Sequence, residues 1–465
     1  MNQLLYDRSA GSLSPQAFAL VQTAQRLHAV QPSPRLLFDG GEKEEAPVNS
    51  DGTGKLRETA DLAEKIWAHQ AGVNSLSLDI ENRLLISGGA DTSIKIWDLG
   101  ECPNGAVHTF KPTATVPKKS SHKFGITQLN FYPFDSAAFL SSSYDHHLKL
   151  YATETLSLSA DFDLNSIIYT HALSPIASHL LVACATQHPA VRLVDLRSGS
   201  NTHSLAGHHG ALLSLAWSPM VEYILASGGI DGTVRLWDIR KSSSSLGVLD
   251  VEDSIGIRST DEIRAGGWGR QSAKAHHGAV NGITWTDDGA YIISAGHDER
   301  MRVWDAATGA NTLASFGPTL KNSHLSNLPL VTCPTSSTPP GKAVLFYPNE
   351  KELLMFELHE GRILKRLKVP GPIMAAVRSR TGERNVKSRI TALVWRGQCD
   401  GVYSAHTDGQ IRAWLPRTVE DDILDEEEEQ SSKMQVDDET AGGKRKRQVL
   451  DDVFKDLTKQ KISFG

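Results

Sequence analysis

A recurring set of four residue types most constrains what this chain can fold into. A histidine is followed after 18 or 19 residues by a serine, 4 residues later by an aspartate and 6 residues later by an aromatic residue. Four copies are complete, and a fifth has no obvious histidine. In chain order the copies are His69, Ser87, Asp91, Trp97; His122, Ser141, Asp145, Tyr151; His208, Ser227, Asp231, Trp237; His276, Ser294, Asp298, Trp304; and Ser404, Asp408, Trp414. Spacing this constant indicates repeated structural units.

Short segments of alternating apolar and polar residues lie between these positions. Around the first copy, NSLSLDI from Asn74 and LLISGGA from Leu84 precede a turn and SIKIWDL from Ser93. The period of two and the Gly, Asp and Asn turns predict strands joined by hairpins. Units of about 40–45 residues built from four such strands are typical of propeller blades.

Two degenerate units fill the gaps between the clear copies. One runs from His171 through LLVACATQHPAVRLVDLR and has Val194 in the aromatic position. The other, AVLFYPNEKELLMFELHEGRILKRL, has Phe356 there. The sequence therefore predicts an all-β fold, a seven-bladed β-propeller of the WD40 type, over residues 61–416.

The repeated Ser, His and Asp residues are predicted to be structural. A hydrolase triad uses the same residue types, but it occurs once and needs an oxyanion hole. Repetition in several units indicates buried polar groups that satisfy one another. Neither a metal nor a cofactor is expected, since His146–His147 has no third ligand at suitable spacing and no GxxxxGKS-type loop is present. The chain is thus predicted to have no catalytic residues.

An N-terminal helical element is predicted in residues 1–35. It starts with apolar Leu4 and Leu5, and Ser14-Pro15 then provides an N-cap and a first-turn proline. An apolar stripe at helical spacing follows: Phe18, Leu20, Val21, Ala24 and Leu27. The stripe suits either packing on the propeller or docking into a partner.

Four further segments depart from the repeat. Residues 36–60 are predicted to be a linker, and insertions are predicted at 241–274 and at 317–342, the latter mobile because it is rich in Pro, Ser and Thr. The charged tail, residues 417–465, is predicted to be disordered. A basic cluster in it suggests a nuclear localisation signal: Lys444, Arg445, Lys446 and Arg447.

Charge and hydropathy exclude several classes of function. The tail has 9 Lys and Arg against 14 Asp and Glu, which leaves the rest of the chain almost neutral within a total of −6. A neutral body predicts little or no direct nucleic-acid binding, although scattered arginines before the last blade, such as Arg384 and Arg389, leave a local basic patch open. No apolar run approaches the ~20 residues that cross a membrane. Four well-separated cysteines fit a reducing compartment, and we expect a nuclear protein.

The end of the fourth blade resembles a known docking motif. Trp237-Asp238-Ile239-Arg240 is similar to the WDxR ending of WD40 substrate receptors of cullin-4-type RING ubiquitin ligases. In that family the arginine helps to dock the propeller onto the damage-specific DNA-binding adaptor subunit, and an N-terminal helix–loop–helix inserts into the same adaptor. The resemblance implies an adaptor-binding role for Asp238 and Arg240, together with the helical residues Leu4, Leu5, Phe18, Leu20, Val21 and Leu27.

Within these receptors, the chain resembles the Cockayne syndrome A family over about residues 66–416. The likeness is carried by NFYPFDSAAFLSSSYDHHLKLY, YTHALSPIASHLLVACAT and AHHGAVNGITWTDDGAYIISAGHDERMRVWDAATGANTL. It implies a non-catalytic substrate receptor in transcription-coupled nucleotide-excision repair. The implied partners are the adaptor, a repair ATPase of the Cockayne syndrome B type and components of stalled RNA polymerase II. The alternative is a generic nuclear WD40 scaffold in chromatin or RNA processing, with the WDxR ending incidental.

Overall fold

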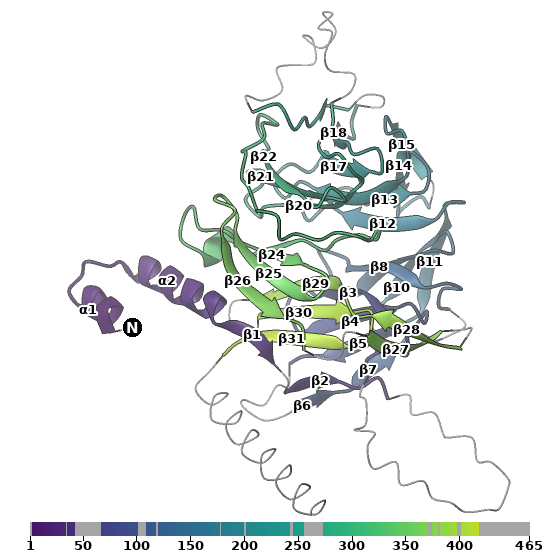
Figure 1. Ribbon diagram of the computed structural model, residues 1–465. Helices are drawn as coiled ribbons and strands as arrows, with labels where there is room; N and C mark the ends of the chain where they lie inside the picture. Colours follow the sequence, from purple (N-terminus) through teal and green to yellow (C-terminus); the bar gives the residue numbers. More distant parts are fainter. Residues whose placement is uncertain are drawn as a thin grey trace, which may run out of the picture. The chain divides into compact units, whose positions relative to one another are not determined.

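Seven antiparallel sheets dominate the computed structural model (Figure 1). It describes residues 2–33, 35–41, 67–100, 108–117, 120–176, 178–199, 201–241, 245–254, 273–370, 374–379, 382–397 and 401–417. Within these ranges, six sheets have four strands and one has three, and the innermost strands of neighbouring sheets contact each other. The predicted seven-bladed propeller is therefore confirmed.

The blades follow one another in chain order, each built from an innermost to an outermost strand. The first three blades are β3 (Val73–Leu78), β4 (Leu84–Gly89), β5 (Ile94–Asp98) and β7 (Pro112–Thr115); β8 (Ile126–Phe131), β9 (Ala138–Ser143), β10 (His147–Ala152) and β11 (Leu158–Asp163); and β12 (Ile168–Leu173), β13 (Leu181–Thr186), β14 (Ala190–Asp195) and β15 (Asn201–Ala206). The next three are β16 (Leu212–Trp217), β17 (Ile224–Gly229), β18 (Val234–Asp238) and β19 (Gly247–Val248); β20 (Val280–Trp285), β21 (Tyr291–Gly296) and β22 (Met301–Asp305); and β23 (Val331–Thr332), β24 (Val344–Pro348), β25 (Glu352–Glu357) and β26 (Ile363–Lys368). The seventh is β29 (Ile390–Gly397), β30 (Gly401–His406), β31 (Ile411–Pro416) and β1 (Val30–Ser33).

The N-terminal strand β1 closes the ring by joining the seventh blade. It pairs antiparallel with β31, so that Val30 faces Pro416 and Ser33 faces Ala413. The next strand, β2 (Leu36–Phe38), pairs in parallel with β6 (His108–Phe110) next to the first blade. The sequence pattern assigns these residues to the docking element and the linker, whereas the structure makes them part of the propeller.

Phe38 shows how this closure joins the first and last blades. Its ring stacks on Phe110 with centroids 4.9 Å apart and meets the edge of Trp97 in the first blade at 5.3 Å. Tyr403 of the seventh blade lies 6.1 Å away on another side. All four aromatic residues belong to one buried cluster, so hydrophobic burial and aromatic contacts tie the two ends of the ring together.

Two helices precede β1. They are α1 (Asn2–Ser9) and α2 (Pro15–His28), and Figure 1 shows α2 leading directly into β1. As the Ser14-Pro15 pair predicts, the Ser14 hydroxyl caps α2 by accepting a hydrogen bond from the Ala17 amide. The helix contacts β31 and a short 3-10 helix, η1 (Thr335–Ser337).

The segment 317–342 differs from the mobile insertion expected from its composition. Leu320, Leu330 and Cys333 are buried, and residues 331–332 form β23 of the sixth blade. Asn322 exchanges side-chain hydrogen bonds with Asn281 of the fifth blade, at 2.7 and 3.1 Å. The burial of these few apolar side chains outweighs the effect of the high Pro, Ser and Thr content, so the segment packs against the blades.

Other segments give a mixed outcome. Of the insertion 241–274, residues 247–248 form β19 and Leu249 is buried, whereas 255–272 lie outside the described residues. The stretch before the seventh blade is a hairpin of β27 (Met374–Ser379) and β28 (Gly382–Lys387). The basic cluster 444–447 and the remainder of the tail beyond residue 417 also fall outside the described ranges.

Strand order assigns the loops of the propeller to two faces. Loops from the first to the second strand and from the third to the fourth strand lie on one face, which we call the Arg240 face because Arg240 follows the third strand of its blade. Turns between the second and third strands, and the links between blades, lie on the other. We call this second face the Asp-turn face after its aspartates: Asp91, Asp145, Asp231, Asp298 and Asp408.

Candidate protein-interaction site

The repeated polar residues form buried hydrogen-bonded sets, one in each of five blades. In the first blade, Ser87 Oγ lies 2.7 Å from His69 Nε2 and accepts a hydrogen bond from Trp97 Nε1 at 2.8 Å. The other ring nitrogen of His69 faces Asp91 at 3.3 Å. The fourth and fifth blades repeat this arrangement around Ser227 and Ser294. Each set links the segment before a blade to its second and third strands.

Charge is distributed within these sets so that the aspartate stays ionised. Burial alone raises the pKa of Asp231, but hydrogen bonding and attraction to His208 outweigh burial, and the pKa ends far below its usual range. Asp91, Asp145 and Asp298 behave in the same way. Burial lowers the pKa of His208 more than Asp231 raises it, so the imidazole is neutral at physiological pH.

The second and seventh blades vary the set. Tyr151 replaces tryptophan, and its hydroxyl donates to the Ser120 carbonyl at 2.7 Å. In the seventh blade the histidine comes from within the strand, since His406 Nε2 lies 2.8 Å from Ser404 Oγ, and Trp414 donates to the same oxygen at 2.7 Å. The sequence spacing does not reveal His406, because it lies two residues after the serine rather than 18 or 19 before it.

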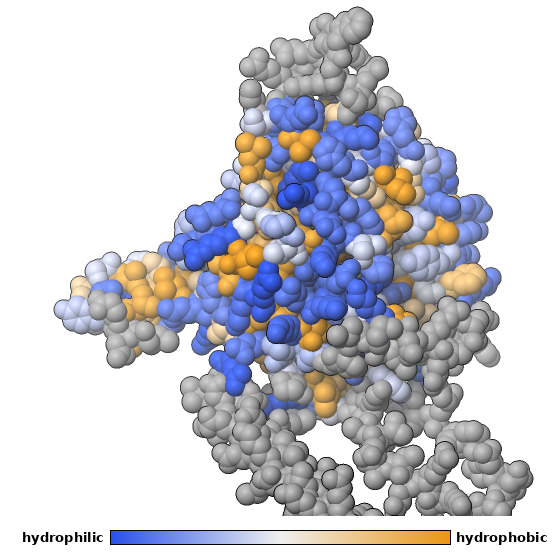
Figure 2. Space-filling model, viewed as in Figure 1, coloured by the Kyte–Doolittle hydropathy of each residue, from blue (hydrophilic) through white to orange (hydrophobic). Residues whose placement is uncertain are grey.

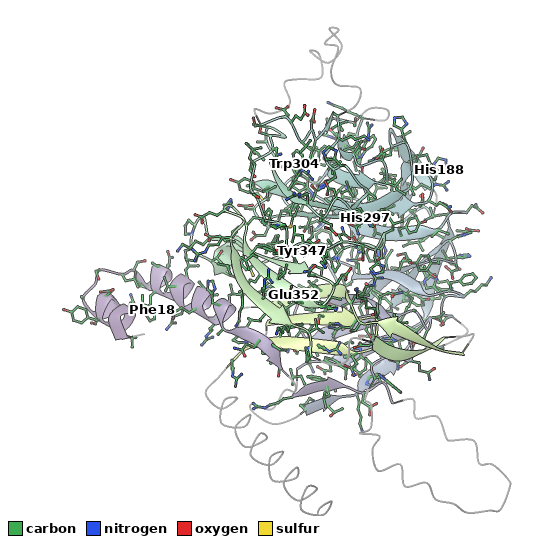
Figure 3. The ribbon with its side chains drawn as sticks, in the orientation of Figure 1. Phe18, His188, His297, Trp304, Tyr347 and Glu352 are labelled. Atoms are coloured by element: carbon green, nitrogen blue, oxygen red, sulfur yellow. The ribbon has the colours of Figure 1, made fainter. Side chains whose placement is uncertain are left out.

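The two degenerate blades replace the set with other packing. Register places Cys184 of the third blade at the serine position, and His171 lies in the innermost strand rather than before it. His171 Nδ1 instead reaches Ser142 Oγ of the second blade at 2.9 Å. In the sixth blade Tyr347 lies in β24 and donates to the Lys321 carbonyl at 3.3 Å. Figure 3 labels Tyr347 within this blade.

These repeated sets build the blades and do not mark a reaction centre. Their histidines and serines are buried and hydrogen-bonded to each other, and the same arrangement recurs in five blades. Within the described residues, no group of three His, Cys, Asp or Glu side chains is placed to hold a metal ion. His147 instead pairs with Asp161 at 2.7 Å. The candidate site must therefore be sought among the exposed groups.

Arg240 is held in a fixed orientation on the surface. Its Nε donates to Asp238 Oδ1 at 2.9 Å and a terminal nitrogen donates to Oδ2 at 2.8 Å, while its guanidinium lies 4.6 Å above the Tyr223 ring. Asp238 is 4% exposed, but the Arg240 side chain is 61% exposed. The WDxR resemblance predicts that Asp238 binds a partner, whereas its burial makes it a positioning residue for Arg240.

The apolar stripe of α2 divides into a buried and an accessible part. Leu27 is 1% exposed and packs in the cluster that contains Trp414, so it is unavailable to a partner, contrary to the sequence prediction. Phe18, Leu20 and Val21 of α2 are only partly buried. On α1, Leu4 is half-buried and Leu5 is 50% exposed. Phe18 lies on α2 away from the sheets (Figure 3), and hydrophobic residues gather on the helical segment in Figure 2.

Exposed apolar residues recur on the Arg240 face. Five large hydrophobic side chains lie there in the loops that join the first and second strands of the first four blades: Ile80, Phe134, Ile176, Met220 and Val221. The α2–β1 junction reaches the same face, because Val30 pairs with Pro416 at the end of the third strand of the seventh blade. One face therefore combines an oriented arginine, exposed apolar loops and the base of the helical element.

Comparisons with known proteins agree with the fold. Residues 62–98, 199–238 and 269–305 match the WD domain, G-beta repeat family. The "WD repeat-containing protein ATCSA-1" of Arabidopsis thaliana is 29% identical over 77% of this chain and 88% of its own length. The "Ribosome biogenesis protein ytm1" of Aspergillus oryzae is 29% identical over 55% of this chain and 56% of its own length. The match to the ribosome biogenesis proteins thus spans about half of their length.

The seven blades, the repeated hydrogen-bonded sets and the matched repeats define the class of this protein. The chain is a WD40 repeat protein with a seven-bladed propeller, a fold that serves as a scaffold for binding other proteins. No helix in the described part of the chain is both long and apolar enough to span a bilayer.

Proposed function

We propose that this protein is a non-catalytic substrate receptor of a cullin-4-type RING ubiquitin ligase in transcription-coupled nucleotide-excision repair. It would dock onto the damage-specific DNA-binding adaptor and hold repair and transcription proteins near the ligase's catalytic subunits. Holding a target in place raises its effective concentration, so no reaction centre is needed in this chain. The proposed partners are the adaptor, a Cockayne syndrome B-type ATPase and stalled RNA polymerase II components, in the nucleus.

The observation that carries this proposal is the composition of the Arg240 face. Arg240 has an exposed, pre-oriented guanidinium, which can bind carboxylates or carbonyls at little entropic cost. The helical element, whose C-terminal end lies beside this face, presents Leu5 and half-buried Phe18 as apolar anchors. Interfaces draw most of their affinity from a few such aromatic and arginine side chains. The extent of the match to ATCSA-1 supports the same proposal.

Binding of the purified adaptor to the full chain tests the proposal, with affinities measured by calorimetry. Deletion of residues 1–24 removes the docking element but keeps Leu27 and the β1 strand, so the melting temperature should be preserved. We expect nanomolar binding by the wild type, a loss of roughly a hundredfold on deletion and about tenfold for Arg240→Ala.

Arg300→Ala is the matched control. Arg300 is an exposed arginine in an Asp-turn of the fifth blade, on the opposite face, and its loss should leave adaptor affinity unchanged. Absence of adaptor binding by the wild type, or equal losses for Arg300→Ala and Arg240→Ala, would contradict the proposal.

A second candidate is a scaffold in ribosome biogenesis, and the matches to the ytm1 proteins favour it. This candidate predicts that the tagged chain co-purifies with precursor ribosomal RNA and that the wild type does not bind the adaptor. Depletion of the protein would then cause precursor ribosomal RNA to accumulate without increasing sensitivity to ultraviolet light.

A further inference from the structure

The centre of the propeller contains a cavity of about 490 Å³. Its wall is formed by the innermost strands of the first, second and seventh blades, with contributions from the third and sixth. A cavity of this size can take a side chain or a short peptide segment.

Most polar side chains of the wall are already used to join neighbouring blades. Asn74 donates to the Ile126 carbonyl at 2.8 Å, and Ser75 Oγ accepts from the Leu129 amide at 2.9 Å. Gln128 donates to Asn130 at 2.9 Å and accepts from the His171 amide at 3.1 Å. These groups hold the ring together and leave little capacity for a ligand.

Three side chains at the Asp-turn end of the cavity are different. Tyr144 and Tyr169 form no hydrogen bond through their hydroxyls within the described residues, and both line the cavity. Arg389 lines the same end, and its side chain donates only to Ser326 Oγ, at 3.0 Å, among the described residues. A guanidinium has five N–H donors, so most of those on Arg389 remain available.

The three groups lie close enough to influence one another. Burial raises the pKa of the Tyr144 hydroxyl, nearby Tyr169 raises it further and Arg389 opposes the rise. The backbone of Arg389 is fixed by a hydrogen bond in each direction to Thr407, at 3.0 Å. The backbone that carries the Arg389 guanidinium is therefore anchored to the seventh blade, which favours a preorganised binding site.

The charge of Arg389 is not neutralised by its surroundings. Among the described residues no carboxylate lies within ion-pair distance of it. The nearest acidic influence is Glu350, which is bound by Lys387 Nζ at 2.5 Å and Ser323 Oγ at 2.8 Å. Burial lowers the pKa of Arg389, which indicates that part of its hydration is lost, and burial also lowers that of neighbouring His324.

We propose that this rim binds an acidic side chain, aspartate or glutamate, of a partner protein. Arg389 would pair with the carboxylate, and the Tyr144 and Tyr169 hydroxyls would donate to the same group. Charge-assisted hydrogen bonds of this kind are the strong ones, and partial desolvation strengthens them further. The rim lies on the face opposite Arg240, so this site can operate with or without adaptor docking.

A labelled hexaglutamate peptide, acetylated and amidated so that only side-chain carboxylates are charged, tests the proposal on the full chain. Fluorescence anisotropy at low salt should show binding that is at least about tenfold tighter than that of hexaglutamine. Arg389→Gln should weaken hexaglutamate binding by about tenfold or more, and the double change Tyr144→Phe with Tyr169→Phe by roughly fivefold. These changes should leave adaptor affinity untouched.

Arg197→Gln is the matched control, since Arg197 is exposed on the Arg240 face and should not affect peptide binding. Melting temperatures of all variants confirm that each is folded. Equal affinity for hexaglutamate and hexaglutamine would overturn the proposal, and so would equal losses for Arg389→Gln and Arg197→Gln. A neutral peptide with one phosphoserine that bound far more tightly than hexaglutamate would also contradict the carboxylate assignment.

Discussion

The ammonium group of Lys365 on β26 donates to the Val30 carbonyl at 2.8 Å and to the His28 carbonyl at 3.1 Å. These two acceptors mark the point at which α2 ends and the ring-closing strand β1 begins. The sixth blade therefore holds the base of the N-terminal helix, although 335 residues separate Lys365 from Val30. The accessible part of α2 is thus attached to the propeller through a fixed junction.

Leu27→Ala should destabilise the propeller much more than Phe18→Ala. Leu27 is fully buried between the sixth and seventh blades, so its truncation is expected to cost about 2–4 kcal/mol of unfolding free energy. Phe18 is half-buried on the same helix, and its truncation should cost less than about 1 kcal/mol. Urea unfolding measures both, and similar values for the two variants would contradict the division of the helix into buried and accessible parts.

Ser227→Ala should be more damaging than its small size suggests. The serine hydroxyl bonds both His208 Nε2 and Trp237 Nε1, and these two buried nitrogens would lose their partner, at a cost of about 2–4 kcal/mol. Cys184→Ala removes a group at the matching position of the third blade, where the described residues form no such network, and should cost about 1 kcal/mol. Thermal unfolding measures the loss of stability in both variants. A loss for Cys184→Ala as large as that for Ser227→Ala would contradict a stabilising role of the hydrogen-bond network.

His171 should make the protein less stable in mild acid. Burial lowers its pKa to about 3 in the folded state, with a smaller contribution from His122, against 6.5 for an ordinary histidine. Between these two pH values the unfolded chain binds a proton that the folded chain does not. The stability contributed by neutral, buried His171 is therefore fully present above pH 6.5. It is lost as pH falls towards 3, at about 1.4 kcal/mol per pH unit.

The variant His171→Gln isolates this effect from other histidines. Unfolding free energies measured at several pH values between 6.5 and 3 should decline less steeply for the variant than for the wild type. Parallel curves would show that His171 is protonated equally in the folded and unfolded states.

Arg240→Lys should weaken adaptor binding while keeping the positive charge. Lysine cannot form the two-pronged pair with Asp238 or lie flat over Tyr223, so the cation would lose its fixed orientation. We expect a loss of roughly threefold to tenfold in calorimetry with the adaptor. Arg197→Lys changes an exposed arginine at the corresponding position of the third blade and serves as the comparison. Wild-type affinity in Arg240→Lys would show that charge alone matters.

The propeller itself could be predicted because its signals are local and repeated. The serine, aspartate and aromatic residue of each clear copy lie 10 residues apart at most, on two strands joined by one turn. Such spacing survives in the sequence, and the hydrogen bonds between Ser227, His208 and Trp237 follow from it. Arg240 could also be singled out, because its motif is a run of four residues at the end of one strand.

The features that could not be predicted depend on positions outside the repeat spacing or on residues that meet only in the closed ring. Pro32 in β1 argues against a strand by sequence, but at the outer edge of the seventh blade its missing amide is tolerated. His406 takes the place of the absent histidine from a position two residues after Ser404 on the same strand, which the repeat spacing does not include. Similarly, Tyr144, Tyr169 and Arg389 come from different blades and converge at one end of the central cavity.

The sequence alone therefore determined the number of blades, the buried polar sets and the motif that contains Arg240, because each is encoded within one unit. The tertiary structure alone decided that residues 30–38 belong to the propeller, that Leu27 is buried and that Arg389 lies at the central cavity with no carboxylate partner among the described residues. These features arise from contacts between segments hundreds of residues apart, and local periodicity carries no information about such contacts.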